Sequence, residues 1–155
     1  MLNFYTHIGN SLIIILLQDK NMKLKDTYEA DFSFSQEEVI QFAILTGDKN
    51  PLHLDAEFAS KTMFKKPIMH GILSVSIFSK ILGMEFPGEG TVYMGQNLEF
   101  KRPMYVDEVY KAVCEVVEVD LRRNIAIIST KVFNAQTNKL TVSGKAKIMN
   151  TSKIV

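Results

Sequence analysis

The segment from Gly71 to Leu82 restricts the possible folds more than any other part of the chain. Its apolar side chains would occur on nearly every side of a helix, and Lys80 is its only charge. A helix that is apolar all round is buried inside a protein. At about 1.5 Å per residue it is roughly 18 Å long, about the depth of a small sheet. We therefore expect one long buried helix that ends at Gly83, a residue type suited to a helix C-terminus.

Five other segments have the pattern of β-strands, with alternating apolar and polar residues or many β-branched ones. Short polar connections join the last three, which predicts an antiparallel meander. One buried helix with one antiparallel sheet indicates an α+β fold, in which the sheet curls around the helix in a hotdog-like architecture. The predicted strands cover residues 26–34, 92–100, 109–119, 125–133 and 140–148.

The composition indicates one globular domain and excludes several kinds of site. The chain has 155 residues, of which 46% are hydrophobic, enough for a substantial core. A net charge of +1 argues against a nucleic-acid partner. The single cysteine, Cys114, cannot form an intrachain disulfide and suits the cytoplasm. With only three histidines in the chain, we expect no metal site.

Residues 1–21 are expected to be an extension that precedes a domain of residues 22–155, with Met1 as an upstream start codon and Met22 as the natural start. The apolar run in this extension, residues 12–17, is far shorter than the roughly 20 residues of a membrane span. No Lys or Arg precedes it, unlike in a signal peptide, so we expect no membrane association. A short docking strand or helix is the alternative interpretation of this segment.

The N-terminal half predicts a helix that leads into a polar loop. Ser35 and Glu38 have the spacing of a capping box, and Gly47 can end the helix. Apolar residues between these limits can form one face of the helix. Asp55 can then cap a second short helix.

Asp48 and His53 lie in this loop, on either side of a turn formed by Asn50 and Pro51. The turn can bring a carboxylate and an imidazole toward one point, where they can act as an acid–base pair. The structural interpretation is that Asp48 binds backbone N–H groups of the loop. Local spacing alone favours that second interpretation.

His70 and Gly71 lie at the start of the predicted buried helix. The Gly71 N–H has no partner within the helix, and the helix dipole there suits a thioester oxygen that gains negative charge. The structural alternative is that Gly71 allows close packing while His70 caps the helix or binds a loop carbonyl. Ser74, Ser76 and Ser79 are each expected to bond back to a carbonyl one turn earlier.

Three segments carry a resemblance to a known family. They are residues 42–53, which include Gly-Asp-Lys-Asn-Pro-Leu-His, residues 67–71 and residues 93–103. In this order they closely resemble the MaoC-like, (R)-specific enoyl-CoA hydratases, over roughly residues 27–149. The resemblance implies a hotdog fold and the reversible syn hydration of trans-2-enoyl-CoA to (R)-3-hydroxyacyl-CoA.

The resemblance also implies roles for single residues. Asp48 and His53 match the catalytic pair that holds and activates water. Gly71 matches the residue whose backbone N–H binds the thioester carbonyl. Ser79 resembles a helix serine that supports the site, and Asn50 resembles the residue that positions the catalytic loop. No metal or cofactor is implied, because the CoA thioester is itself the substrate.

Several aspects of function stay open at the level of sequence. Four cationic residues flank the matched segments and are candidates to bind CoA phosphates: Lys65, Lys66, Lys101 and Arg102. An ordinary solvated surface charge explains them equally well. A homodimer or a higher homo-oligomer is expected, since pairing would cover an open sheet edge. The alternatives are a 3-hydroxyacyl-ACP dehydratase, a hotdog acyl-CoA thioesterase and a non-catalytic acyl-CoA-binding module.

Overall fold

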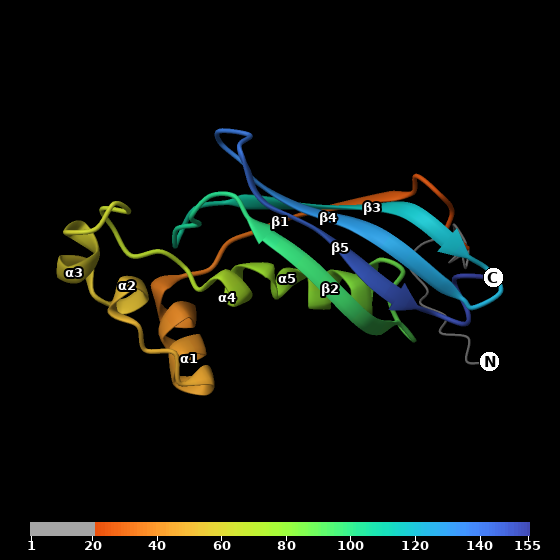
Figure 1. Ribbon diagram of the computed structural model, residues 1–155, viewed down its shortest axis with the longest axis horizontal. Helices are drawn as coiled ribbons and strands as arrows, with labels where there is room; N and C mark the ends of the chain where they lie inside the picture. The colour runs from red at the N-terminus through yellow and green to blue at the C-terminus, as the bar shows by residue number, and fades with distance from the viewer. Residues whose placement is uncertain (1–20) are drawn as a thin grey trace, which may run out of the picture.

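The computed structural model describes residues 21–155, and a five-stranded antiparallel sheet forms its main body (Figure 1). The strands lie in the order β1-β3-β4-β5-β2. The predicted meander of β3, β4 and β5 is confirmed, and β1 and β2 pair with its two edges. The strands are β1 (Thr27–Phe32), β2 (Val92–Phe100), β3 (Tyr110–Asp120), β4 (Ile125–Asn134) and β5 (Leu140–Met149).

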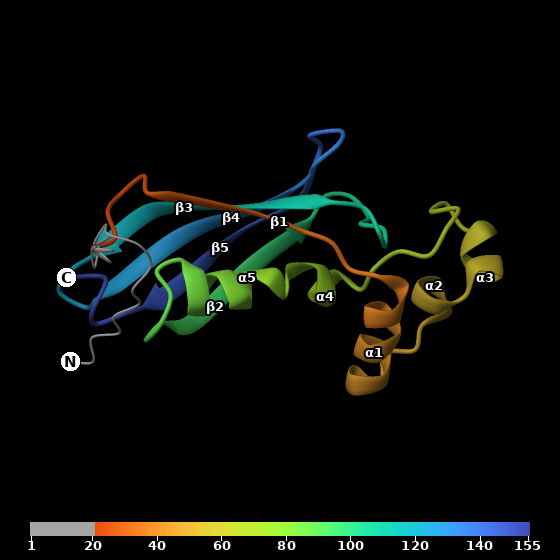
Figure 2. The same ribbon diagram turned by 180° about the vertical axis from the view of Figure 1, so that it is seen from behind.

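The helical segment that follows His70 packs against one face of this sheet, as both views show (Figures 1 and 2). Along β3 and β4, buried side chains alternate with partly exposed ones, as expected for strands that turn one face to a core. The α+β fold with a helix against the sheet is therefore confirmed. Its fully buried side chains include Phe78, Ile81, Leu82, Val116, Ile128 and Ile148.

The helical segment is broken, whereas one continuous helix was predicted. It consists of α4 (Gly71–Val75), α5 (Ile77–Lys80) and the π-helix η1 (Ile81–Glu85). The break lies at Ser76, whose N–H and hydroxyl both donate to the Leu73 carbonyl, at 3.1 and 2.7 Å. Such i→i−3 bonds are tighter than those of an α-helix. Gly83 does not end the segment, because the Phe86 N–H donates to the Ile81 carbonyl, five residues earlier, at 2.7 Å.

Three short helices lie beyond one end of the sheet (Figures 1 and 2): α1 (Gln36–Thr46), α2 (Pro51–Leu54) and α3 (Ala56–Ser60). The predicted capping box begins α1. Ser35 Oγ accepts from the Glu38 N–H at 3.3 Å, and Glu38 Oε2 accepts from the Ser35 N–H at 2.8 Å. Asp55 caps α3 as predicted, with Oδ1 accepting from the Phe58 N–H at 2.9 Å.

Apolar side chains are more exposed than predicted in both helical regions. Ile72 of α4 is 62% exposed, although the whole segment was expected to be buried. The predicted apolar face of α1 buries Val39 and Ala43 but leaves Ile40 and Ile44 at the surface. The single chain therefore does not cover all the apolar surface of its own helices.

The predicted extension, residues 1–21, lies outside the described residues except for Asn21. Met22 is buried, and its N–H donates to the Lys153 carbonyl at 2.7 Å. Within residues 21–155, no helix combines the length and hydrophobicity needed to cross a membrane.

Cys114 is a core residue of β3. Its side chain is fully buried, and burial raises the pKa of the thiol to about 12. The thiol therefore stays protonated and unreactive.

The left-handed backbone at Gly47, with φ of 80°, predicts a stability cost for any side chain there. Gly47→Ala should lower the free energy of unfolding by about 1–2 kcal/mol, measured by urea unfolding followed by circular dichroism. Gly83→Ala is the control, because an added Cβ meets nothing within 4 Å there and φ is not left-handed. It should leave stability unchanged or slightly raised. Equal losses in the two variants would contradict the expectation.

Candidate active site

Asp48 is the second residue after α1, directly following Gly47. Gly47 ends that helix in the left-handed conformation, and its N–H donates to the Ala43 carbonyl. The Asp48 N–H then donates to Thr46 Oγ1 at 3.3 Å, and Asp48 Oδ1 accepts from the Asn50 N–H at 3.3 Å. The side chain is 55% exposed, so its carboxylate is accessible.

Asn50 begins the short helix that carries His53. Its Oδ1 accepts from the Leu52 N–H at 3.0 Å, and Pro51 occupies the first turn, where a missing N–H costs nothing. The Asn50 carbonyl also accepts from the His53 N–H at 3.0 Å. The spacing Asp-x-Asn-Pro-x-His is therefore a turn and a capped helix that place His53 beside Asp48.

The His53 ring has a defined proton position. Its Nδ1 lies 2.8 Å from the Ile68 carbonyl oxygen, which can only accept, so Nδ1 carries the hydrogen. In the neutral ring Nε2 then keeps its lone pair. This atom is suited to take a proton from a bound molecule.

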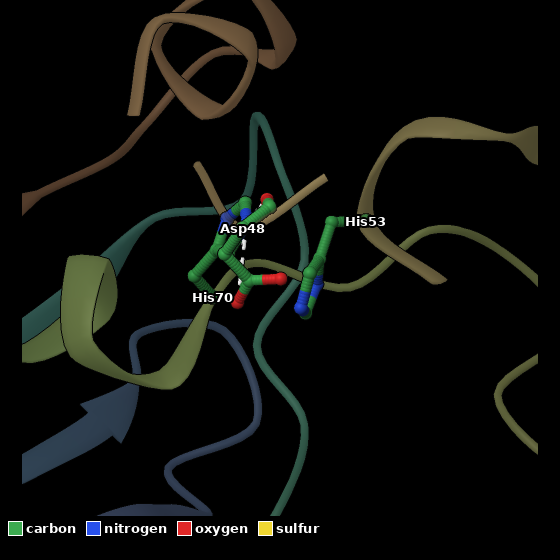
Figure 3. Close-up of side chains that lie close together, drawn as sticks. All are labelled: Asp48, His53 and His70. Atoms are coloured by element: carbon green, nitrogen blue, oxygen red, sulfur yellow. Dashed lines mark hydrogen bonds and ion pairs between the residues drawn. The ribbon is translucent and has the colours of Figure 1, made fainter. Parts of the chain in front are cut away.

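His70 completes the cluster (Figure 3). It is 3% exposed, and its Nε2 lies 2.9 Å from the Asp48 backbone carbonyl oxygen and 3.9 Å from Asp48 Oδ2. The centroids of the His53 and His70 rings are 3.8 Å apart. The prediction that His70 binds a loop carbonyl is confirmed. Its ring contact with His53 was not predicted, because residues so far apart in sequence give no local sign of contact.

Gly71 follows His70 and begins α4. A Cβ at this position would lie 3.0 Å from Phe100 Cζ and 3.1 Å from Cε1, tighter than ordinary contacts. The glycine therefore lets the end of β2 approach the start of α4, as the packing interpretation expected. Its N–H is one of the first in the helix, where intrahelical acceptors are lacking.

The other predicted residues lie around this centre or away from it. Ser79 is an exposed residue of α5 and is not a member of the cluster of Asp48, His53 and His70. The expected back-bonding is confirmed for Ser74 and Ser76, whose hydroxyls donate to carbonyls three residues earlier at 2.7 Å. The supporting role of Ser79 stays a prediction.

Three of the four candidate CoA-binding cations already have partners in the chain. Lys66 pairs with Glu108 at 2.9 Å and lies 4.1 Å from the centroid of the Tyr105 ring. Lys101 pairs with Glu99, and Arg102 donates to the Leu140 carbonyl. Lys65 adopts a left-handed φ of 66° in the loop before α4. Their role in CoA binding stays a prediction.

The cluster is also a conceivable metal site, since donor atoms of Asp48, His53 and His70 lie within 4.8 Å of one another. Zinc in proteins takes three or four protein ligands. His70, however, directs Nε2 to the Asp48 carbonyl, and its Nδ1 is buried. The two remaining side chains fit an acid–base pair better than a metal centre.

The chain is similar to known proteins over most of its length. A family model described as "MaoC like domain" matches residues 18–138. The (R)-specific enoyl-CoA hydratase of Aeromonas caviae is 44% identical over 115 residues, which are 74% of this chain and 85% of that protein. A mitochondrial 3-hydroxyacyl-[acyl-carrier-protein] dehydratase of Arabidopsis thaliana is 32% identical over 127 residues, covering 81% of this chain and 75% of that protein.

The chain is also similar in fold to solved structures. The (R)-hydratase from A. caviae involved in PHA biosynthesis superposes with a TM-score of 0.80 at 39% identity. The match covers 83% of this chain and 97% of that one. The order of elements, the sheet and the likeness in sequence lead to one conclusion: the chain belongs to the MaoC-like domain family and has its hotdog fold.

Proposed function

We propose that this protein is an (R)-specific enoyl-CoA hydratase, which adds water reversibly to trans-2-enoyl-CoA and forms (R)-3-hydroxyacyl-CoA. The observation that carries the proposal is that an oxygen of the Asp48 carboxylate lies within 4.8 Å of a ring nitrogen of His53, whose Nε2 is left free by the bond from Nδ1 to the Ile68 carbonyl. The 44% identity to a hydratase of that name supports it.

The chemistry needs two proton transfers on one face of the substrate. As the water oxygen attacks the β-carbon, Asp48 and His53 hold the water and remove one of its protons. The α-carbon then takes a proton from the same pair, so that the elements of water add to one face of the double bond. Addition is therefore syn, and it consumes no cofactor.

Negative charge gathers on the thioester oxygen during this addition. We propose that the Gly71 N–H binds that oxygen, with His70 and Gly71 at the junction of the loop and α4. Loss of such a donor typically costs about 3 kcal/mol of barrier. Asn50 is proposed to hold the loop through its cap on α2, and Ser79 to support the acyl end of the site.

We propose that four cationic side chains bind the phosphates of the CoA carrier: Lys65, Lys66, Lys101 and Arg102. Relatives named for CoA and for acyl-carrier-protein substrates both match this chain, so an acyl-ACP dehydratase is the nearest alternative.

With Cys114 reduced and buried, we propose that the enzyme is located in the cytoplasm.

A thioesterase and a non-catalytic acyl-CoA-binding module are more distant alternatives. Crotonyl-CoA separates all of them from a hydratase. Hydration removes the enoyl absorbance without releasing free thiol, hydrolysis releases thiol, and a binding module changes neither signal.

Substitution of the proposed catalytic pair tests the assignment. Asp48→Asn and His53→Ala should each lower kcat for crotonyl-CoA hydration at least about a hundredfold, because proton transfer loses its acceptor. Circular dichroism should show an unchanged fold. The control is Glu57→Gln, the same change of carboxylate to amide at an exposed position paired with Lys61. Near wild-type activity in either site variant would refute the proposed pair.

We also propose that the protein is a homodimer whose interface includes β2 and α4. β2 is an edge strand that pairs with β5 alone in the described chain. Unpaired edges with apolar side chains associate readily. Exposed apolar residues of the two elements are Ile72, Val92, Met94 and Phe100.

Light scattering during gel filtration tests the dimer. The wild-type protein should have twice the 17.6 kDa mass of one chain. Ile72→Glu should shift it toward the monomer, since a charge would be buried in the interface. Leu121→Glu is the control, because this exposed residue lies in the turn between β3 and β4, away from the proposed interface. A monomeric wild type, or an unshifted Ile72→Glu, would exclude this interface.

A further inference from the structure

His70 is a buried polar residue in contact with both members of the proposed catalytic pair. Its ring packs against that of His53 at a tilt of 32°, with 3.8 Å between centroids, and its centroid lies 5.1 Å from that of the Phe42 ring. Its Nε2 reaches the backbone carbonyl of Asp48 at 2.9 Å, whereas the Asp48 carboxylate is 3.9 Å away. The hydrogen bond therefore goes to the main chain of Asp48 and leaves the carboxylate free.

The proton on His70 can be placed from these contacts. A carbonyl oxygen only accepts, so Nε2 carries the hydrogen that it donates. His70 Nδ1 is buried and has no hydrogen-bond partner among residues 21–155. A buried N–H without an acceptor would add a further desolvation cost. His70 is accordingly the Nε2–H tautomer, the opposite of His53, whose proton is on Nδ1.

This arrangement leaves His70 no atom for chemistry on a substrate. Its only N–H is committed to Asp48, and its other nitrogen is enclosed. What the bond does is join two parts of the site that are far apart in sequence. Within residues 47–50, the other hydrogen bonds run between near neighbours, such as that from the Asn50 N–H to Asp48 Oδ1. His70 ties the loop to the first residue of α4, Gly71.

We propose that His70 is a positioning residue, which sets the Asp48 loop and the His53 ring against the Gly71 N–H through its Nε2–H bond to the Asp48 carbonyl. The proposal rests on the proposed hydratase function, because it concerns the same site. A positioning error of about 1 Å in such a site can cost about a hundredfold in rate. His70 would therefore affect kcat without touching the substrate.

Two variants of equal length separate the hydrogen bond from simple packing. His70→Gln keeps an amide N–H at the place of Nε2, and His70→Met fills similar space without a donor. His70→Met should lower kcat for crotonyl-CoA about ten- to a hundredfold while KM changes less than about twofold. His70→Gln should recover most of that loss. Circular dichroism and Tm report whether each variant is folded.

A purely structural role predicts a different outcome: the two variants would lose activity to the same extent, and the loss would follow their Tm. Equal kcat values for His70→Gln and His70→Met, both folded, would therefore overturn the proposal. So would wild-type kcat in His70→Met.

A measurement on the wild-type protein decides the matter if the variants do not fold. Long-range ¹H–¹⁵N correlation spectra distinguish protonated from unprotonated imidazole nitrogens, and the chain has only three histidines to assign. The expected result is a protonated Nε2 and an unprotonated Nδ1 on His70. A proton on Nδ1 with none on Nε2 would overturn the proposal. The spectrum is independent of turnover, so a protein that hydrates no enoyl-CoA would refute the proposed function separately.

Discussion

The packing of residues 71–85 on one face of the sheet is the interaction on which the rest of the structure depends. Phe78, Ile81 and Leu82 are fully buried there, and each such side chain contributes about 1.5–3 kcal/mol by leaving water. This packing fixes where α4 begins, and so places His70 and Gly71 at the end of the sheet. The loop that carries Asp48 and His53 meets them at that point (Figure 3).

Main-chain carbonyls organise the site itself. The Ile68 carbonyl fixes the proton of His53 on Nδ1, and the Asp48 carbonyl receives the Nε2–H of His70. Carbonyls of ordered backbone are rigid acceptors, so the two rings are held in one relative orientation. The side-chain atoms left over, the Asp48 carboxylate and His53 Nε2, are those that the proposed chemistry uses. The proposed acid–base pair therefore consists of the exposed Asp48 carboxylate and the His53 ring, with the His70 ring packed beside it.

Features that depend on neighbouring residues could be predicted from the sequence. The capping box of Ser35 and Glu38 and the left-handed Gly47 are set by local backbone geometry, and the strands by their alternation. The proximity of Asp48 and His53 also follows from one turn.

Features that depend on hydrogen bonds from a side chain to the helix backbone, or on contacts between distant residues, could not be predicted from the sequence. At the break, the N–H and the hydroxyl of Ser76 both donate to the Leu73 carbonyl, which no hydrophobic pattern records. The contact of His70 with His53 joins residues that are separated in sequence by α3 and the loop after it. Ile72 looked like a core residue because burial was inferred from apolar character, whereas the single chain leaves it exposed.

The central claim is that one Asp–His pair adds water to one face of an enoyl thioester. Hydration of crotonyl-CoA in deuterium oxide tests it most directly, with the product analysed by NMR and chiral chromatography. The claim predicts a single diastereomer, with deuterium on the α-carbon syn to the new hydroxyl and the (R) configuration at the β-carbon. Anti addition, the (S) product or release of free CoA in place of hydration would contradict it.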